Sequence, residues 1–395
     1  MPGALDGLRV LDLTRLLPGG FCTLLLADMG AEVLKIEDTR GGDYIRWMPP
    51  YYGNEQERRE GTASAYYLAL NRNKRSMRLD LKHQQGRDVL LRLVERYDVL
   101  VESFRPAVMD RLGVGYETLR ARNPRLIYCP ISGYGQDGPL TARSGHDTNY
   151  LALNGLLGLT GRRNGPPIQS AGQIADLGGG GLMAAVGILA AVIERERSGE
   201  GQLVDVSMTD GSLAWLSMVI ARYFAEQKVP HRGDPELTGG IACYFPYETK
   251  DGKWVSLGAL EPKFWQNWCA GVGRPDLVEK QFVHPASESG EEIAAVFKER
   301  TRDEWTAFAG EHDCCLEPIL DLDEVVDSEL VQARGMIVEL DQPGIGPVKQ
   351  VGAPIKLSRT PADTSGPAPA LGEDTDEVLR ELGIDPGPLR EEGVV

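Results

Sequence analysis

Residues 8–37 alternate between apolar runs and a helical stretch, and this alternation constrains the fold more than any other feature of the sequence. Residues 8–13 (LRVLDL) are rich in branched apolar side chains, which is typical of a buried parallel strand. A turn containing Pro18 follows, then a helical stretch at 21–30 and a second apolar run at 31–37. Strand, helix and strand within roughly thirty residues match a βαβ unit.

The same alternation continues along the chain. The pattern predicts a helix at 88–97, a strand at 98–103, helices around 108–113 and 116–123, a strand at 125–133, a helix at 182–199 and a strand at 202–208. We therefore expect α/β architecture, with a doubly wound, Rossmann-like large domain. The chain has no P-loop, and GGGGLMAAVG does not satisfy GxGxxG. It also lacks HExxH and a serine nucleophile elbow, so an NAD enzyme or a serine hydrolase is not expected.

The pattern changes after Gly240. Residues 243–260 predict a hairpin that turns at Lys250–Lys253, and helical stretches follow at 263–273, 291–301 and 303–312. These elements favour a smaller α+β domain. An extended stretch at 348–361, a Pro-rich linker at 362–370 and a helix at 374–383 complete the chain. The expected division is 1–212 for the large domain, 213–235 for a linker helix, 236–325 for the small domain, and 326–395 for a return linker and the rest of the large domain.

Composition narrows the functional class. A formal charge of −16 over 395 residues argues against binding to nucleic acid or to an anionic membrane. The six cysteines form no CxxC pair and no zinc-finger spacing with histidine, so we expect buried, reduced thiols. The start shows no signal-peptide pattern, and the most apolar run, Leu182–Ile193, is too short to span a bilayer. We expect a cytoplasmic protein without membrane partners.

His146 is one of only five histidines, in the stretch SGHDTNYLALNG at 144–155. A histidine is by default a hydrogen-bonded structural residue, and Asp147 and Asn149 would then support the same loop. The alternative is a proton carrier, because imidazole titrates near neutral pH. Taken alone, the stretch leaves both interpretations open.

Asp176 precedes four glycines in QIADLGGGGLM. A lone aspartate before glycines is commonly a helix N-cap. The same geometry suits chemistry: glycines such as Gly178 and Gly179 let a ligand approach closely, and N–H groups at a helix start stabilise an oxyanion. Asp176 would then be a base or a nucleophile. Glu261, in GALEPKFW after a predicted strand, is by itself either a surface carboxylate or a helix cap.

Basic residues follow predicted strands or loops of the large domain. Arg72, Lys74 and Arg75 lie in NRNKRS, and Arg105 lies in SFRPAV. They form either a solvated face or a patch that binds the phosphates of a ligand, since no glycine fingerprint is present to do so.

Seven ordered stretches together resemble the CaiB/BaiF family, the class III CoA-transferases and their racemase relatives. They are LRVLDLTRLLPGGFCTLLLADMGAEVLKIE, GGD at 41–43, NRNKRSMRLDLK, VESFRPAVMDRLG, NPRLIYCPISGYGQDGP, SGEGQLVDVSM and PIKLSRTPA. The resemblance implies an acyl-CoA substrate and a homodimer with interlocked chains. It also implies a large domain built from both termini and a small domain from the middle. On this basis the residues expected to bind CoA are Arg40, Arg72, Lys74, Arg75, Arg105 and Tyr134.

Two chemistries compete within the family that the chain resembles. In the transferases, an aspartate at the position of Asp176 is a nucleophile that forms an aspartyl-CoA thioester. In the α-methylacyl-CoA racemases it is one base, and the histidine of a GHDxNY motif, here His146, is the other. Glu261 matches a racemase glutamate near that histidine across the dimer interface. The stretch LTGGIACY has only Gly239 and Gly240 where transferases have a longer glycine-rich flap, which is racemase-like.

The resemblance thus predicts epimerisation of 2-methylacyl-CoA through an enolate. Its oxygen would be stabilised by N–H groups of Gly178 and Gly179, with Asp147 in support. Some racemases have an asparagine at the position of Gly172, and Gln173 would replace it here. No metal or other cofactor is expected, because CoA enters as the substrate's thioester and already acidifies the α-carbon. A CoA-transferase and a non-catalytic CoA-binding protein stay as alternatives.

Overall fold

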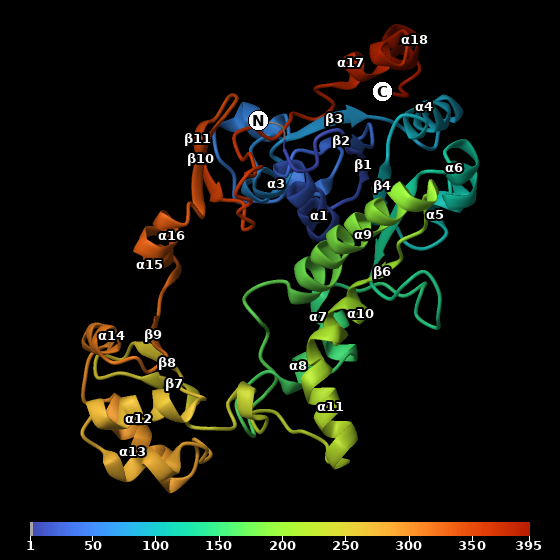
Figure 1. The fold of residues 1–395 in the computed structure, drawn as a ribbon. Helices are drawn as coiled ribbons and strands as arrows, with labels where there is room; N and C mark the ends of the chain where they lie inside the picture. Colours follow the sequence, from blue (N-terminus) through green and yellow to red (C-terminus); the bar gives the residue numbers. More distant parts are fainter. Residues whose placement is uncertain (1–2) are drawn as a thin grey trace. The chain divides into compact units, whose positions relative to one another are not determined.

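The computed structural model describes residues 3–395 and divides into two compact units. The first unit comprises the residues up to Asn154 together with Gly172–Ala214 and Gln332–Val395, and the second comprises Gly155–Ala171 and Trp215–Val331. Both ends of the chain contribute to the first unit (Figure 1). Residues 155–171, which we expected in the large domain, group with the second unit instead.

The first unit is built on a six-stranded parallel sheet in the order β3-β2-β1-β4-β5-β6. Its strands are β1 Arg9–Leu13, β2 Glu32–Glu37, β3 Lys74–Arg78, β4 Val99–Glu102, β5 Ile127–Ser132 and β6 Val206–Ser207. This is the Rossmann order, in which the chain direction across the sheet reverses between β1 and β4. Ligands of such sheets bind in the crevice at the carboxyl ends of the strands around that point.

Helices cover this sheet. They are α1 Leu17–Asp28, η1 Tyr44–Trp47, α2 Glu55–Arg59, α3 Ala65–Asn71, α4 Gln84–Val94, α5 Val108–Arg111, α6 Tyr116–Arg122, α7 Asp147–Leu153, η2 Ile174–Leu182, α9 Met183–Ser198, α10 Met208–Leu213, α17 Thr375–Glu381 and α18 Pro386–Glu391. One core cluster joins Leu11, Leu34 and Leu100 of the sheet to Leu90 of α4 and Val378 of α17. The C-terminal helices therefore complete the core of a domain that the N-terminal strands begin (Figure 1).

Two sequence expectations for this unit were wrong. The stretch 362–370 is not a free linker: Ala368 is buried, and its N–H donates to Gln342 Oε1 at 3.0 Å. It packs beside a hairpin of β10 Ile337–Gln342 and β11 Gly346–Val351. The strand expected at 202–208 is interrupted: β6 pairs with β5 at Val206 and Ser207, and Leu203 forms a separate parallel bridge to Tyr128 of β5.

The glycine run forms a π-helix, η2, that continues directly into α9. The two make one helical segment, Ile174–Ser198, of 25 residues. By length and composition this segment could cross a membrane, so the expectation from the shorter run Leu182–Ile193 is corrected. Gly178–Gly181 are nevertheless buried inside the first unit, where η2 packs on α1 and α10.

The second unit is a small α+β domain around a three-stranded antiparallel sheet, in the order β7-β8-β9. Its elements are α8 Leu156–Leu159, α11 Ser217–Glu226, η4 Glu236–Thr238, β7 Tyr244–Glu248, β8 Trp254–Gly258, α12 Pro262–Gly271, η5 Pro275–Lys280, α13 Glu288–Phe297, α14 Arg302–Glu311, β9 Leu316–Ile319 and α15 Leu322–Asp327. The short segments η3 Ala214–Leu216 and α16 Glu329–Ala333 lie where the units meet in sequence. Stacked aromatic rings fill the core: the ring centroids of Trp265 and Trp268 lie 4.9 Å apart, and those of Trp268 and Phe297 lie 5.2 Å apart.

Candidate active site

Asp176 is the third residue of η2, whose glycines are explained by close packing. A Cβ on Gly179 would lie 2.6 Å from the Met208 carbonyl oxygen of α10, and one on Gly181 would lie 2.6 Å from the Pro18 carbonyl oxygen of α1. Only glycine permits both approaches. Long π-helices are rare and occur chiefly at functional sites. The run therefore fixes the helix that carries Asp176.

The carboxylate of Asp147 links the two predicted bases. Its Oδ1 accepts hydrogen bonds from the N–H of Ala175 at 2.7 Å and of Asp176 at 3.0 Å. Asp147 is the first residue of α7, and His146 precedes it as the N-cap. The His146 N–H donates to Asn149 Oδ1 at 3.0 Å. The starts of α7 and η2 are thus tied together, with the exposed His146 at the first start and the partly buried Asp176 at the second.

Burial, and then the negative Asp147, raise the pKa of Asp176 to about 7. A carboxyl group in this state can accept or release a proton near neutral pH, as general acid–base catalysis requires. The raised pKa therefore makes Asp176 a candidate for proton transfer.

Two tyrosines complete this cluster. The Tyr150 hydroxyl donates to the Gly145 carbonyl at 2.6 Å, and its pKa is raised by burial and by Asp176. The Tyr134 ring lies 5.2 Å from that of Tyr150, edge to face. Tyr134 thus packs on Tyr150 and does not line the cavity described next, and its role in binding CoA stays a prediction.

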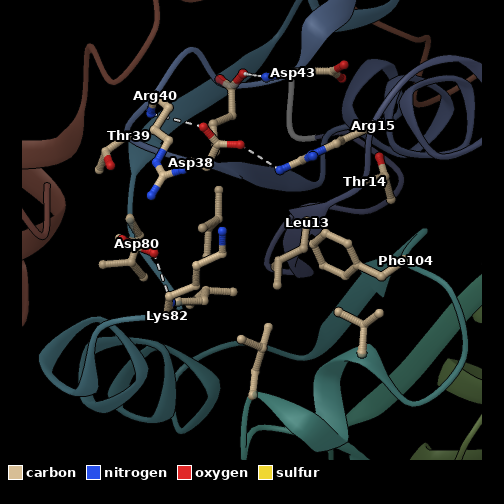
Figure 2. Close-up of a pocket in the computed structure, with 16 residues that line it drawn as sticks. Leu13, Thr14, Arg15, Asp38, Thr39, Arg40, Asp43, Asp80, Lys82 and Phe104 are labelled. Carbon is tan, nitrogen blue, oxygen red and sulfur yellow. Dashed lines mark hydrogen bonds and ion pairs between the residues drawn. The ribbon is translucent and has the colours of Figure 1, made fainter.

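A cavity of about 290 Å³ lies at the carboxyl ends of β1, β2, β3 and β4 in the first unit. Its lining residues are Leu13, Thr14, Arg15, Ile36, Glu37, Asp38, Thr39, Arg40, Asp43, Leu79, Asp80, Leu81, Lys82, Phe104, Val108 and Leu112. Figure 2 shows apolar side chains such as Leu13 and Phe104 on one side and charged ones on the other. The position matches the crevice expected for a Rossmann-type sheet.

The cavity combines free and paired cations. Arg15 Nη2 pairs with Asp38 Oδ2 at 2.6 Å. The side chains of Arg40 and Lys82 form no ion pair within residues 3–395 (Figure 2). Arg105 is exposed next to Phe104 and is likewise unpaired in the described part of the chain. Free cations on a chain of net charge −16 favour an anionic ligand here.

Three of the basic residues predicted to bind CoA form ion pairs within the fold. Arg72 is 2% exposed and pairs with Asp28 at 2.6 Å. Lys74 is buried on β3 and pairs with Asp12 at 3.2 Å. Arg75 contacts the carboxylates of Glu32, Asp374, Glu377 and Glu381. Because their charges are neutralised within the fold, we expect these side chains to contribute less to phosphate binding than unpaired cations.

The buried pairs hold the β1–α1 loop that borders the cavity. Burial lowers the pKa of Lys74 to about 8. Burial would raise the pKa of Asp12, but the positive charges of Lys35 and Lys74 outweigh this effect and lower it to about 2. Asp12 Oδ1 accepts the Thr14 N–H at 2.9 Å, and Lys35 Nζ donates to the Thr14 carbonyl at 2.9 Å. These bonds fix Thr14, which lines the cavity.

Glu261 lies in the second unit as the exposed N-cap of α12, near Cys315. Cys315 borders a larger cavity of about 830 Å³ in that unit. The large apolar and aromatic side chains that line it are Ile168, Leu237, Tyr244, Phe245, Tyr247, Trp254 and Leu257. Its volume falls within the range of small-molecule sites.

Sequence reasoning missed Lys82, Arg15, Asp38 and Phe104 as cavity residues. Lys82 could have been found only after recognising β3, because it follows the end of that strand. The role of Gln173 stays a prediction: it is the exposed N-cap of η2, and its carbonyl accepts the Leu177 N–H at 2.9 Å. Among the described residues, 3–395, no cluster of three His, Cys, Asp or Glu side chains could hold a metal ion.

Comparisons with known proteins agree on one family. A sequence model described as CoA-transferase family III matches residues 5–375. The human protein named alpha-methylacyl-CoA racemase is 36% identical over 96% of this chain and 94% of its own length. A Haloarcula marismortui protein named succinyl-CoA:mesaconate CoA-transferase is 38% identical over 99% of both chains.

A solved structure gives the same result. A CaiB/BaiF family protein from Brucella suis superposes with a TM-score of 0.82 at 31% identity. The match covers 97% of this chain and 100% of the other. The α/β architecture with its large parallel sheet and small antiparallel sheet is thus the CaiB/BaiF fold.

Proposed function

The chain belongs to CoA-transferase family III, and on that premise we propose that it epimerises 2-methylacyl-CoA thioesters at C2. The observation that supports this proposal is the hydrogen bond from the Asp176 N–H to Asp147, which links the start of η2 to the helix that His146 caps. Epimerisation needs two groups that exchange protons with opposite faces of one carbon. The racemase names among the relatives support the same reaction.

The cavity at the carboxyl ends of β1–β4 is the proposed site for the nucleotide end of CoA. Its apolar side suits an adenine ring, and Arg40 and Lys82 suit phosphate groups. Arg105 would add a third cation at the rim. CoA enters as part of the substrate, and we propose no further cofactor.

In the proposed reaction, one base removes the proton from C2, and the electron pair of the broken C–H bond passes to the thioester oxygen as an enolate. The other base then gives its proton to the opposite face of C2, so atoms and charge balance. Asp176, with its pKa near 7, is suited to either role. His146 is the partner base.

The enolate oxygen requires hydrogen-bond donors. In a π-helix each N–H pairs with the carbonyl five residues earlier, so the N–H of Gly179 falls within the bonding of η2 itself. The same rule pairs the N–H of Gly178 with the carbonyl of Gln173, so it does not separate the two glycines, and we propose both Gly178 and Gly179 as donors. Asp147 and Gln173 would support this end of the helix.

A second copy of the chain is the proposed partner. On α9, Val186 and Ile193 are 56% and 58% exposed, and on α11, Met218 and Phe224 are 78% and 66% exposed. Apolar helix faces of this kind are usually covered in an assembly. We propose an interlocked homodimer in which Glu261 of one chain faces His146 of the other. The 830 Å³ cavity beyond Cys315 would then accept the acyl group.

Transfer of CoA between carboxylic acids is the second candidate, because relatives that are 38% and 32% identical to this chain carry transferase names. In that reaction the Asp176 carboxylate would attack an acyl-CoA and then carry CoA as a thioester. His146 has no role in it.

Incubation of the protein with a single epimer of a 2-methylacyl-CoA in D₂O separates the two. Epimerisation predicts deuterium at C2 and growth of the other epimer. Absence of exchange, together with passage of CoA to an added carboxylate, would establish the transferase and reject the racemase.

A further inference from the structure

The turn between β4 and α5 forms one wall of the nucleotide cavity. Phe104 of the turn lines the cavity together with Val108 and Leu112 at the two ends of α5, and Figure 2 shows the Phe104 ring facing Leu13 across from the charged residues. The Arg15 guanidinium lies 5.8 Å from the Phe104 ring centroid, and the Arg15 N–H donates to Ser103 Oγ at 3.0 Å. The position of this turn therefore sets the shape of the cavity.

Glu102 holds the turn from beneath. It is the last residue of β4 and is 4% exposed. Its Oε2 accepts the Phe104 N–H at 2.6 Å, and its Oε1 accepts the Tyr128 hydroxyl of β5 at 3.1 Å. Glu102 forms no ion pair within residues 3–395 and is not a lining residue of the cavity.

A buried carboxyl group without a cation is costly to keep. Burial raises the pKa of Glu102 to about 7, and nearby Asp110 adds to this, although the bonds from Phe104 and Tyr128 oppose it. A less costly apolar side chain would fill the same space, but it would leave the Phe104 N–H without this acceptor.

We propose that Glu102 is a positioning residue that fixes the β4–α5 turn in the conformation that receives the nucleotide end of CoA. The proposal rests on the proposed function of the cavity. Glu102 acts through the Phe104 amide, and no residue of α7 or η2 lines this cavity. Its loss should therefore weaken the binding of CoA and of its esters without slowing the chemical step.

The test compares Glu102→Ala with the isosteric Glu102→Gln in the full-length protein. Calorimetric titration with free CoA gives Kd, and epimerisation of a 2-methylacyl-CoA gives KM and kcat. For Glu102→Ala we expect Kd and KM to rise about tenfold, the equivalent of one charge-assisted hydrogen bond, with kcat within about twofold of the wild type. Glu102→Gln keeps an acceptor for Phe104 and a donor for Tyr128, so it should restore Kd to within about threefold.

Hydrogen–deuterium exchange of the peptide that contains Phe104 reports on the turn directly. Exchange should accelerate in Glu102→Ala and stay near the wild-type rate in Glu102→Gln. If Glu102→Ala does not fold, Glu102→Asp serves instead, because it keeps the charge but withdraws the oxygens from the Phe104 N–H. It should also raise Kd and accelerate exchange.

A folded alanine or aspartate variant with wild-type Kd would overturn the proposal, as would a fall in kcat at unchanged KM. Failure of the wild type to bind CoA would instead reject the proposed function of the cavity. In that case the Phe104 exchange rate still decides whether Glu102 holds the turn.

Discussion

Asp176 is partly buried where its ionisation is unfavourable, and this has a consequence for stability. Its pKa is raised from 3.8 to about 7. Between these values the folded protein binds a proton that the unfolded chain has released, so the free energy of unfolding falls as pH rises through this window. Asp176→Asn removes the effect. After allowance for its partial exposure, we expect the variant to be more stable than the wild type by about 1–2 kcal/mol at pH 8.

Urea denaturation of both proteins at pH 5 and pH 8 measures this difference in the free energy of unfolding, which should be smaller at pH 5 than at pH 8. Equal stability of the two proteins at pH 8 would mean that the carboxyl group is not strained. The stability that Asp176→Asn gains is the stability that the wild type loses by keeping a functional carboxyl group at this position.

Arg40 and Lys82 are the cations that we propose to bind the phosphate groups of CoA. Arg40→Ala and Lys82→Ala should each weaken CoA binding by about tenfold at low salt, since each removes one charge-assisted contact, and should leave the melting temperature unchanged. Calorimetric titration at two salt concentrations measures this. Arg75→Ala is the control, because Arg75 is neutralised by carboxylates of the fold. An equal loss of affinity in the control would disprove the assignment.

The sequence indicated His146 and Asp176 through their motifs, but it could not separate structural from ligand-binding cations. Arg72 pairs with Asp28 across 44 positions of the chain, and Lys74 pairs with Asp12 across 62. No local pattern signals such partners. Their charge alone therefore led to the prediction that Arg72 and Lys74 bind the phosphates of CoA. Lys82, which does line the cavity, was not predicted.

At the scale of elements, η2 depends on its glycines. A Cβ on Gly179 would meet the Met208 carbonyl and the Ser212 N–H nitrogen at 2.6 and 2.8 Å, and neither backbone can move freely. We expect Gly179→Ala to destabilise the protein by about 3 kcal/mol, at the upper end of overpacking costs.

Chemical denaturation measures the free energy of unfolding of Gly179→Ala, and Gly310→Ala is the matched control. Gly310 lies in α14 with open space where a Cβ would stand, so alanine there should be neutral or stabilising by up to about 1 kcal/mol. Similar effects of the two substitutions would show that the glycines of η2 are not required for packing.

Most elements followed from apolar periodicity, and the failures have physical causes. β1, β2, β4 and β5 were predicted because buried parallel strands are continuously apolar. β3 was missed because KRSMR is polar: Lys74 and Ser76 are buried but satisfied by Asp12 and Glu37. The π-helix was missed because glycines argue against any helix unless a close neighbour requires them.

At the scale of the whole molecule, the exposed apolar faces of α9 and α11 predict a stable dimer. Light scattering coupled to size-exclusion chromatography should give about twice the chain mass of 43.2 kDa. Phe224→Glu should shift the population toward monomer, because a charge would be buried without a partner. The exposed Glu288→Lys, a change of charge on α13, is the control. A monomeric wild type at micromolar concentration would reject the interlocked dimer.

The central claim, that His146 and Asp176 act on opposite faces of C2, is tested most directly by α-proton exchange of each pure epimer in D₂O with His146→Ala and Asp176→Asn. Each variant should retain exchange from the one epimer whose proton faces its surviving base and lose it from the other by about 10²-fold or more, with opposite preferences in the two variants. Neither variant should interconvert the epimers at an appreciable rate. Wild-type exchange from both epimers in His146→Ala would contradict the claim.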